Sequence, residues 1–154
     1  MTEPTHGIVV APGEGKQYGR AGAWTLTTKA GNDDTRGAYT CQEMTVAPEF
    51  PGVRLHVHHN EDEAMYVLAG EVTARVGEQT HVLGAGAFIL MPREVPHSFA
   101  NPSATEARVL VINSPGAVEK YFEETAELAK TNGGQLDMQD QVELAEKYGI
   151  EFIL

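Results

Sequence analysis

The chain has 154 residues, 42% of them hydrophobic and 21% charged, a composition that suits one folded domain and excludes a disordered chain. Its 22 acidic and 11 basic residues give a formal net charge of -11, and such a surface would repel phosphate backbones and anionic lipids. We therefore expect no nucleic acid and no membrane among its partners. The single cysteine, Cys41, excludes an intrachain disulfide.

The sequence carries no recognisable targeting or membrane signal. Its first residues, MTEPTHGIVV, lack the basic stretch and the long apolar run of a signal peptide. No window approaches the roughly 18 apolar residues that a transmembrane helix needs. These features predict a soluble, cytoplasmic protein.

Short apolar segments separated by Gly and Pro turns follow one another through residues 38–112. An earlier strand is expected at residues 23–29, where apolar residues alternate with threonines. No long amphipathic helix interrupts the series, so the pattern predicts an all-β antiparallel sandwich or barrel. The expected strands span residues 39–46, 54–59, 63–68, 71–76, 80–83, 87–91, 97–100 and 107–112.

Residues 114–154 change to a helical pattern. Ser114 followed by Pro115 is typical of a helix start, and apolar residues then recur every three or four positions as far as Leu128. Asp137 is expected to cap a second helix that stops at Gly149. We expect a helical hairpin that packs on the barrel or on a partner subunit and has a structural role.

A cluster of histidines and a glutamate indicates a metal site. His56 and His58 are two residues apart, so on a strand they share a face, and Glu63 begins the next strand after a four-residue link. His97 follows Pro96 at the start of a later strand. Three imidazoles and one carboxylate form a mixed nitrogen and oxygen site for a divalent transition metal, with coordination positions left open for water or substrate. A solvated polar turn is the alternative.

Two segments resemble the two motifs of the cupin superfamily. The first, HVHHNEDEAMYVLAGEV, has the spacing His, one residue, His, four residues, Glu, six residues, Gly, and the second runs from Gly86 through Pro92 and His97 to Asn101. Over nearly the whole chain the sequence is similar to small, single-domain quercetin-dioxygenase-like cupins.

The resemblance implies a double-stranded β-helix, or jelly-roll barrel, followed by C-terminal helices. Residues 1–154 would form one cupin domain, with a core at about 38–112 and helices in 114–154. The family's metal ligands fall on His56, His58, Glu63 and His97. The metal would be nickel, iron, manganese, zinc, cobalt or copper, because imidazole and carboxylate ligands bind all of these ions and do not identify one. A homodimer is also implied.

The resemblance further implies that Glu63 accepts the substrate's hydroxyl proton in a dioxygenase that acts on a small enolisable or phenolic substrate. A non-oxidative metal-dependent isomerase or cyclase, and a non-enzymatic small-molecule-binding protein, remain as alternatives. The chain departs from the second motif at Glu94, where a glycine is common. This carboxylate could tighten a turn or charge the rim of the site.

Side-chain parity predicts the wall of the substrate cavity. Met65 and Val67 share the strand face of Glu63, and Phe99 shares the face of His97, so these three are expected to line an apolar cavity, unless each is ordinary core. His59 should point away from the site. We expect Arg54 to pair with an acidic neighbour rather than to anchor an anionic substrate.

Overall fold

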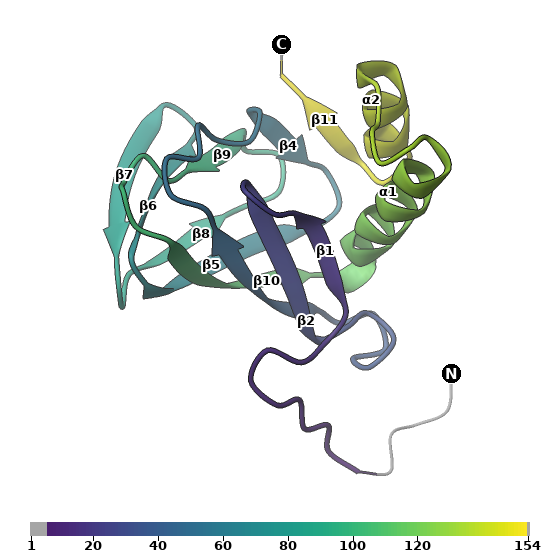
Figure 1. Cartoon of the computed structure of the whole chain (residues 1–154), viewed down its shortest axis with the longest axis horizontal. Coiled ribbons are helices and arrows are strands. Elements are labelled where there is room, and N and C mark those ends of the chain that lie inside the picture. The colour runs from purple at the N-terminus through teal and green to yellow at the C-terminus, as the bar shows by residue number, and fades with distance from the viewer. Residues whose placement is uncertain (1–5, 154) are drawn as a thin grey trace.

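The computed structural model describes residues 6–153, which form two β-sheets with a helical pair at one side (Figure 1). The expectation that no signal peptide is present concerns an N-terminal stretch whose first five residues lie outside this range. Within the described residues, no helix is both long enough and apolar enough to span a bilayer.

The larger sheet holds six antiparallel strands in the order β1-β2-β3-β10-β5-β8. Its strands are β1 (Gln17–Arg20), β2 (Trp24–Ala30), β3 (Thr40–Val46), β10 (Ala107–Ser114), β5 (Asp62–Ala69) and β8 (Phe88–Met91). The smaller sheet has the order β11-β4-β9-β6-β7. Its strands are β11 (Ile150–Phe152), β4 (His56–His58), β9 (His97–Ala100), β6 (Glu71–Val76) and β7 (Gln79–Gly84).

Alternation of buried and exposed side chains explains why these strands face one another. In β3 every second residue, from Thr40 to Val46, is buried, and β10 repeats the pattern from Ala107. The apolar members of these sets meet between the sheets and form the larger hydrophobic core. Two facing antiparallel sheets followed by helices confirm the predicted double-stranded β-helix.

A glycine turn joins the two sheets where β5 ends. Gly70 has a φ of 73°, and a Cβ at this position would lie 2.6 Å from the carbonyl oxygen of Glu106. A side chain is therefore excluded both by the backbone conformation and by the neighbouring chain. This turn lets β5 in the larger sheet continue into β6 in the smaller one.

The C-terminal helices begin slightly later than the sequence suggested. β10 continues through Ser114, whose hydroxyl donates a hydrogen bond to the carbonyl oxygen of Ala38 instead of capping a helix. A 3₁₀ turn (Gly116–Val118) then leads into α1 (Glu119–Thr131). The helix α2 (Met138–Lys147) begins as predicted, because Asp137 accepts a hydrogen bond from the backbone N–H of Asp140 at 2.8 Å.

The strand β11, which no sequence pattern indicated, returns the chain to the barrel. It pairs with β4 in the register Ile150 to His58 and Phe152 to His56. Gly149, with a φ of 72°, ends α2, and its carbonyl oxygen accepts a hydrogen bond from the backbone N–H of His59. The C-terminal segment thus becomes the edge of the sheet that carries the predicted metal ligands.

Candidate metal centre

The four predicted ligands come from three strands in two sheets. His56 and His58 lie on β4, and His97 begins β9 directly beside them, in register with His56. Glu63 lies on β5, which belongs to the opposite sheet, so the short link after His58 crosses the barrel. The carboxylate therefore faces the three imidazoles across the interior, rather than from a strand paired with β4.

These side chains converge closely enough to share one cation. One donor atom from each of the residues His56, His58, Glu63 and His97 lies within 4.8 Å of the others. The Glu63 Oε2 atom is 3.4 Å from His58 Nε2 and 3.6 Å from His97 Nε2. The ring centroids of His56 and His97 are 4.5 Å apart.

The three imidazoles are oriented by partners on their other ring nitrogen. His56 Nδ1 donates to the carbonyl oxygen of Arg54 at 2.7 Å, and His97 Nδ1 donates to that of Val95 at 3.1 Å. His58 Nδ1 is bound by the carboxylate of the buried Glu61. Because each Nδ1 carries the proton, each Nε2 presents a lone pair to the site, as in histidines that bind metal ions.

One buried atom supports the fit of a cation to this site. The side chain of His97 is 1% exposed, and its Nε2 atom has no hydrogen-bond partner within residues 6–153. A buried nitrogen without a partner costs free energy, and a metal ion bound to its lone pair would remove that cost. The donor set, three imidazoles and one carboxylate, suits a divalent transition metal without selecting one.

The electrostatics of the cluster favour the metal-binding protonation states of His56 and Glu63. Burial and the repulsion from His97 and His58 lower the pKa of His56 to about 4, so its imidazole is neutral at physiological pH. Burial opposes the charge on Glu63, but the neighbouring imidazoles outweigh it and lower the pKa of this carboxyl to about 2. Burial also lowers the pKa of His97, but the adjacent Glu63 carboxylate raises it above its usual value. Glu63 is therefore ionised, and a positive charge on His97 or on a bound cation balances it.

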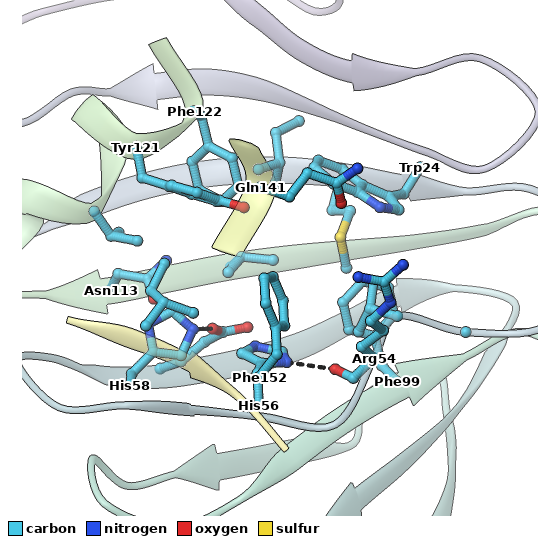
Figure 2. Close-up of a pocket in the computed structure, with 18 of the residues that line it drawn as sticks. Trp24, Arg54, His56, His58, Phe99, Asn113, Tyr121, Phe122, Gln141 and Phe152 are labelled. Carbon is cyan, nitrogen blue, oxygen red and sulfur yellow. Dashed lines mark hydrogen bonds and ion pairs between the residues drawn. The ribbon is translucent and has the colours of Figure 1, made fainter. Parts of the chain in front are cut away.

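A cavity of about 390 Å³ opens from the ligands, within the size range of small-molecule sites. In Figure 2, His56 and His58 lie on one side, and Tyr121, Phe122, Gln141 and Trp24 lie across from them. The wall is mainly apolar and combines barrel strands with the C-terminal elements. Its aromatic residues are Trp24, Phe50, Phe99, Tyr121, Phe122 and Phe152.

Only one of the three residues expected to line the cavity does so. Phe99 lines it, whereas Met65 and Val67 do not and are instead fully buried in the hydrophobic core. Parity placed all three side chains inside the barrel as expected. Met65 and Val67 follow Glu63 along β5, however, and lie deeper in the packed interior than the cavity reaches.

Two other expectations also have clear outcomes. His59 points to the surface, where its ring nitrogens contact Glu94 and Glu151, each at 2.9 Å. Glu94, with a φ of 68°, thus ties the turn before β9 to the ends of β4 and β11. Arg54 has no acidic partner among the described residues; it contacts the sulfur of Met138 and lies over the ring of Phe152.

Several site residues had no signal in the sequence. Glu61 could have been suspected from its place beside the histidines, but nothing marked it as the partner of His58. Tyr121, Gln141 and Phe152 reach the cavity because α1, α2 and β11 fold back over the barrel. Their position depends on tertiary packing alone.

The barrel is similar to a known protein family. Residues 42–113, from β3 to β10, match the family model described as a cupin domain. These residues form a cupin domain. The match includes all four predicted ligands.

Known proteins resemble the chain in sequence or in fold. The chain is 37% identical to protein SchB of Streptomyces halstedii over 78 residues, which are 49% of this chain and 56% of SchB, so the match spans about half of either protein. It is 22% identical to the polyketide cyclase RemF of Streptomyces resistomycificus, with a TM-score of 0.62 over 71% of this chain and 80% of RemF. An RmlC-like cupin from Shewanella frigidimarina is 18% identical, with a TM-score of 0.62 over 77% of this chain and 99% of that one. The two solved structures are similar in fold.

Proposed function

We propose that this cupin is a metal-dependent dioxygenase that acts on a small phenolic or enolisable molecule. The observation that carries the proposal is the convergence of three imidazole Nε2 atoms and the Glu63 carboxylate on one point at the end of an apolar cavity. An apolar cavity with a charged, directional group at its end suits a planar organic molecule with one polar anchor. We also propose that residues 1–154 act as one unit, because barrel and C-terminal elements share the cavity wall.

The roles of the four ligand residues follow from their chemistry. His56, His58 and His97 would hold the metal through Nε2, and Glu63 would hold it through a carboxylate oxygen. When bound, a divalent metal supplies positive charge that stabilises an enolate or phenolate oxygen. Four protein ligands leave room for a substrate oxygen in a five- or six-coordinate site.

Glu63 is also proposed as the acceptor of the proton that the substrate hydroxyl loses. Its low pKa keeps it ionised and able to accept throughout the physiological range. A carboxylate of such low basicity holds a proton only briefly, so the proton would pass on to product or solvent. The aromatic side chains around the cavity would exclude bulk water during this step.

Oxygen consumption tests the proposal. Protein loaded separately with nickel, iron, manganese and cobalt would be mixed with quercetin, other flavonols and enediols in an oxygen electrode. We expect uptake with at least one pairing, its loss in Glu63→Gln, and its retention in the exposed control His81→Gln. No uptake with any pairing would contradict the proposal for these substrates.

The same experiment separates the alternatives. Product formed without dioxygen would replace the dioxygenase with a non-oxidative isomerase or cyclase. Binding without any product would indicate a small-molecule-binding protein, detected as ligand-dependent thermal stabilisation.

We further propose a homodimer that forms through the outer face of the larger sheet. Tyr66 on β5 is in register with Phe88 on β8, and Leu90 and Ile112 lie on the same exposed face. Phe88 is 62% exposed at the edge of the sheet. A contiguous exposed apolar patch of this kind is typical of a protein interface.

A further inference from the structure

Two arginine side chains line the cavity that His56 and His58 also line. Arg20 is the last residue of β1, at the tip of the hairpin with β2, and Arg54 lies two residues before β4. Two guanidinium groups in one cavity are unexpected in a chain with 22 acidic and 11 basic residues. The overall composition, which is acidic, therefore does not explain why two arginines line this cavity.

Neither guanidinium is neutralised by the protein. Within residues 6–153, no carboxylate forms an ion pair with Arg20 or Arg54, whereas Arg93 is paired with Asp62. The contacts of Arg54 are a hydrogen bond to the sulfur of Met138 and the face of the Phe152 ring, 5.8 Å from its centroid. A thioether and an aromatic ring orient the guanidinium without supplying a negative charge.

The two kinds of polar group lie at different depths in the cavity. His58 and Glu63 are buried, whereas Arg20 and Arg54 are exposed and therefore lie at the mouth. In Figure 2 the guanidinium of Arg54 extends toward Gln141 and Trp24, away from His58. Aromatic side chains line the wall of the cavity between these two ends.

We propose that the cavity selects a planar, apolar substrate that carries a carboxylate, with the carboxylate bound by Arg54 and Arg20 and the opposite end directed to the buried ligands. This inference rests on the proposed function for the metal-facing end only. A guanidinium pairs with a carboxylate through two parallel hydrogen bonds, and the Phe152 ring already holds that of Arg54 in place. A neutral analogue of the same shape would lose this interaction.

Caffeate is a suitable probe, because a catechol and a carboxylate lie at opposite ends of a planar molecule. Its methyl ester has nearly the same shape but no charge. Isothermal titration of zinc-loaded protein avoids oxidation of the catechol, since zinc is redox-inactive. We expect caffeate to bind roughly 10- to 100-fold more tightly than the ester, the range for a hydrogen bond to a charged group.

Matched variants assign the preference to the arginines. Arg54→Gln should lose most of the preference for caffeate without weakening binding of the ester, and Arg54→Lys should keep part of it. Arg20→Gln should lose a smaller part. Arg75→Gln, on β6 and outside the cavity, should behave as the wild type.

Metal content distinguishes the inference from the proposed function. Because the Arg54 carbonyl oxygen holds His56, each variant must bind as much zinc as the wild type for its affinity to be compared. The titrations are repeated on metal-free protein. A protein that takes up no zinc but prefers caffeate through Arg54 contradicts the proposed function and supports the inference. Equal affinity for caffeate and its ester, no binding of caffeate, or an unchanged preference in Arg54→Gln would overturn the inference.

Discussion

The carboxylate of Glu61 accepts a hydrogen bond from Nδ1 of His58, and both side chains are almost completely buried. Glu61 follows His58 by three residues, and the intervening turn places its carboxylate against the His58 ring. A carboxylate bound to Nδ1 fixes the tautomer of a histidine and increases the basicity of its Nε2. Glu61 is thus a positioning residue for the predicted ligand His58.

We predict that Glu61→Gln weakens zinc binding about 10- to 100-fold, because the neutral amide polarises the imidazole less than the carboxylate does. Competition with a chromogenic chelator at pH 7.5 measures the affinity. The exposed Glu71→Gln, at the start of β6, is the matched control and should bind zinc as the wild type does. Equal affinities for the two variants would exclude a role for Glu61 at the metal.

Metal binding should also stabilise the fold. Zinc at 100 times its dissociation constant adds about 2.7 kcal/mol to the free energy of unfolding, which corresponds to a rise in Tm of roughly 5–10 °C for a chain of this size. We expect no rise in His56→Gln or His97→Gln and a full rise in His81→Gln, as measured by differential scanning calorimetry. A wild-type Tm that does not respond to any of the candidate metals would mean that the cluster is a polar core without a metal.

The stability of the metal-free protein should fall in mild acid because of His56. Its pKa is about 4 in the folded state and about 6.5 when unfolded, so the unfolded chain takes up the proton first as the pH decreases. The stabilising contribution is present above pH 6.5 and is lost as the pH falls toward 4. Its upper limit is on the order of 3 kcal/mol.

Urea denaturation from pH 7.5 to pH 4.5 measures this effect. The free energy of unfolding should decrease less steeply for His56→Gln than for the wild type in this interval. Parallel curves for the two proteins would show that burial and the neighbouring imidazoles do not hold His56 neutral.

His59 should give a pH effect of opposite sign. Its hydrogen bonds with Glu94 and Glu151 raise its pKa, so its stabilising contribution is present below pH 6.5 and is lost as the pH rises through its folded pKa. The contact joins β11 to the rest of the barrel, and we expect lower protection factors for the amides of β11 above that pH, after correction for the intrinsic pH dependence of exchange. Glu151→Gln should weaken the pH dependence of exchange. An unchanged profile would contradict this role.

The spacing of the predicted ligands could be read from the sequence because it depends on local geometry. Residues two apart on a strand share a face, so His56 and His58 were placed together correctly. The position of Glu63 required knowing that the chain crosses between sheets after β4, and no local pattern encodes that crossing.

The cavity wall was harder to predict for a related reason. Parity identified the inward side of Met65 and Val67 but not their depth, which depends on how closely the two sheets pack. Phe152 belongs to a three-residue strand with no periodicity of its own, and only its pairing with β4 brings it to His56.

If the protein is a dimer, a charged substitution on the outer face of the larger sheet should lower the mass of the particle in solution. Phe88→Glu should convert the protein to a monomer, because a charge in an apolar interface would lose its hydration. Light scattering after gel filtration measures the mass. Val82→Glu, on the exposed face of β7, is the control and should leave the mass unchanged. A wild-type protein that is already monomeric at micromolar concentration would contradict the proposal.

The pairing of β11 with β4 has a consequence for the order in which the protein matures on the ribosome. All four predicted ligands lie between residues 56 and 97, whereas Tyr121, Gln141 and Phe152 emerge later. A nascent barrel therefore has its complete set of donor atoms while its interior still opens to solvent. Loading of the ion before the last strand docks would need no opening of the finished molecule.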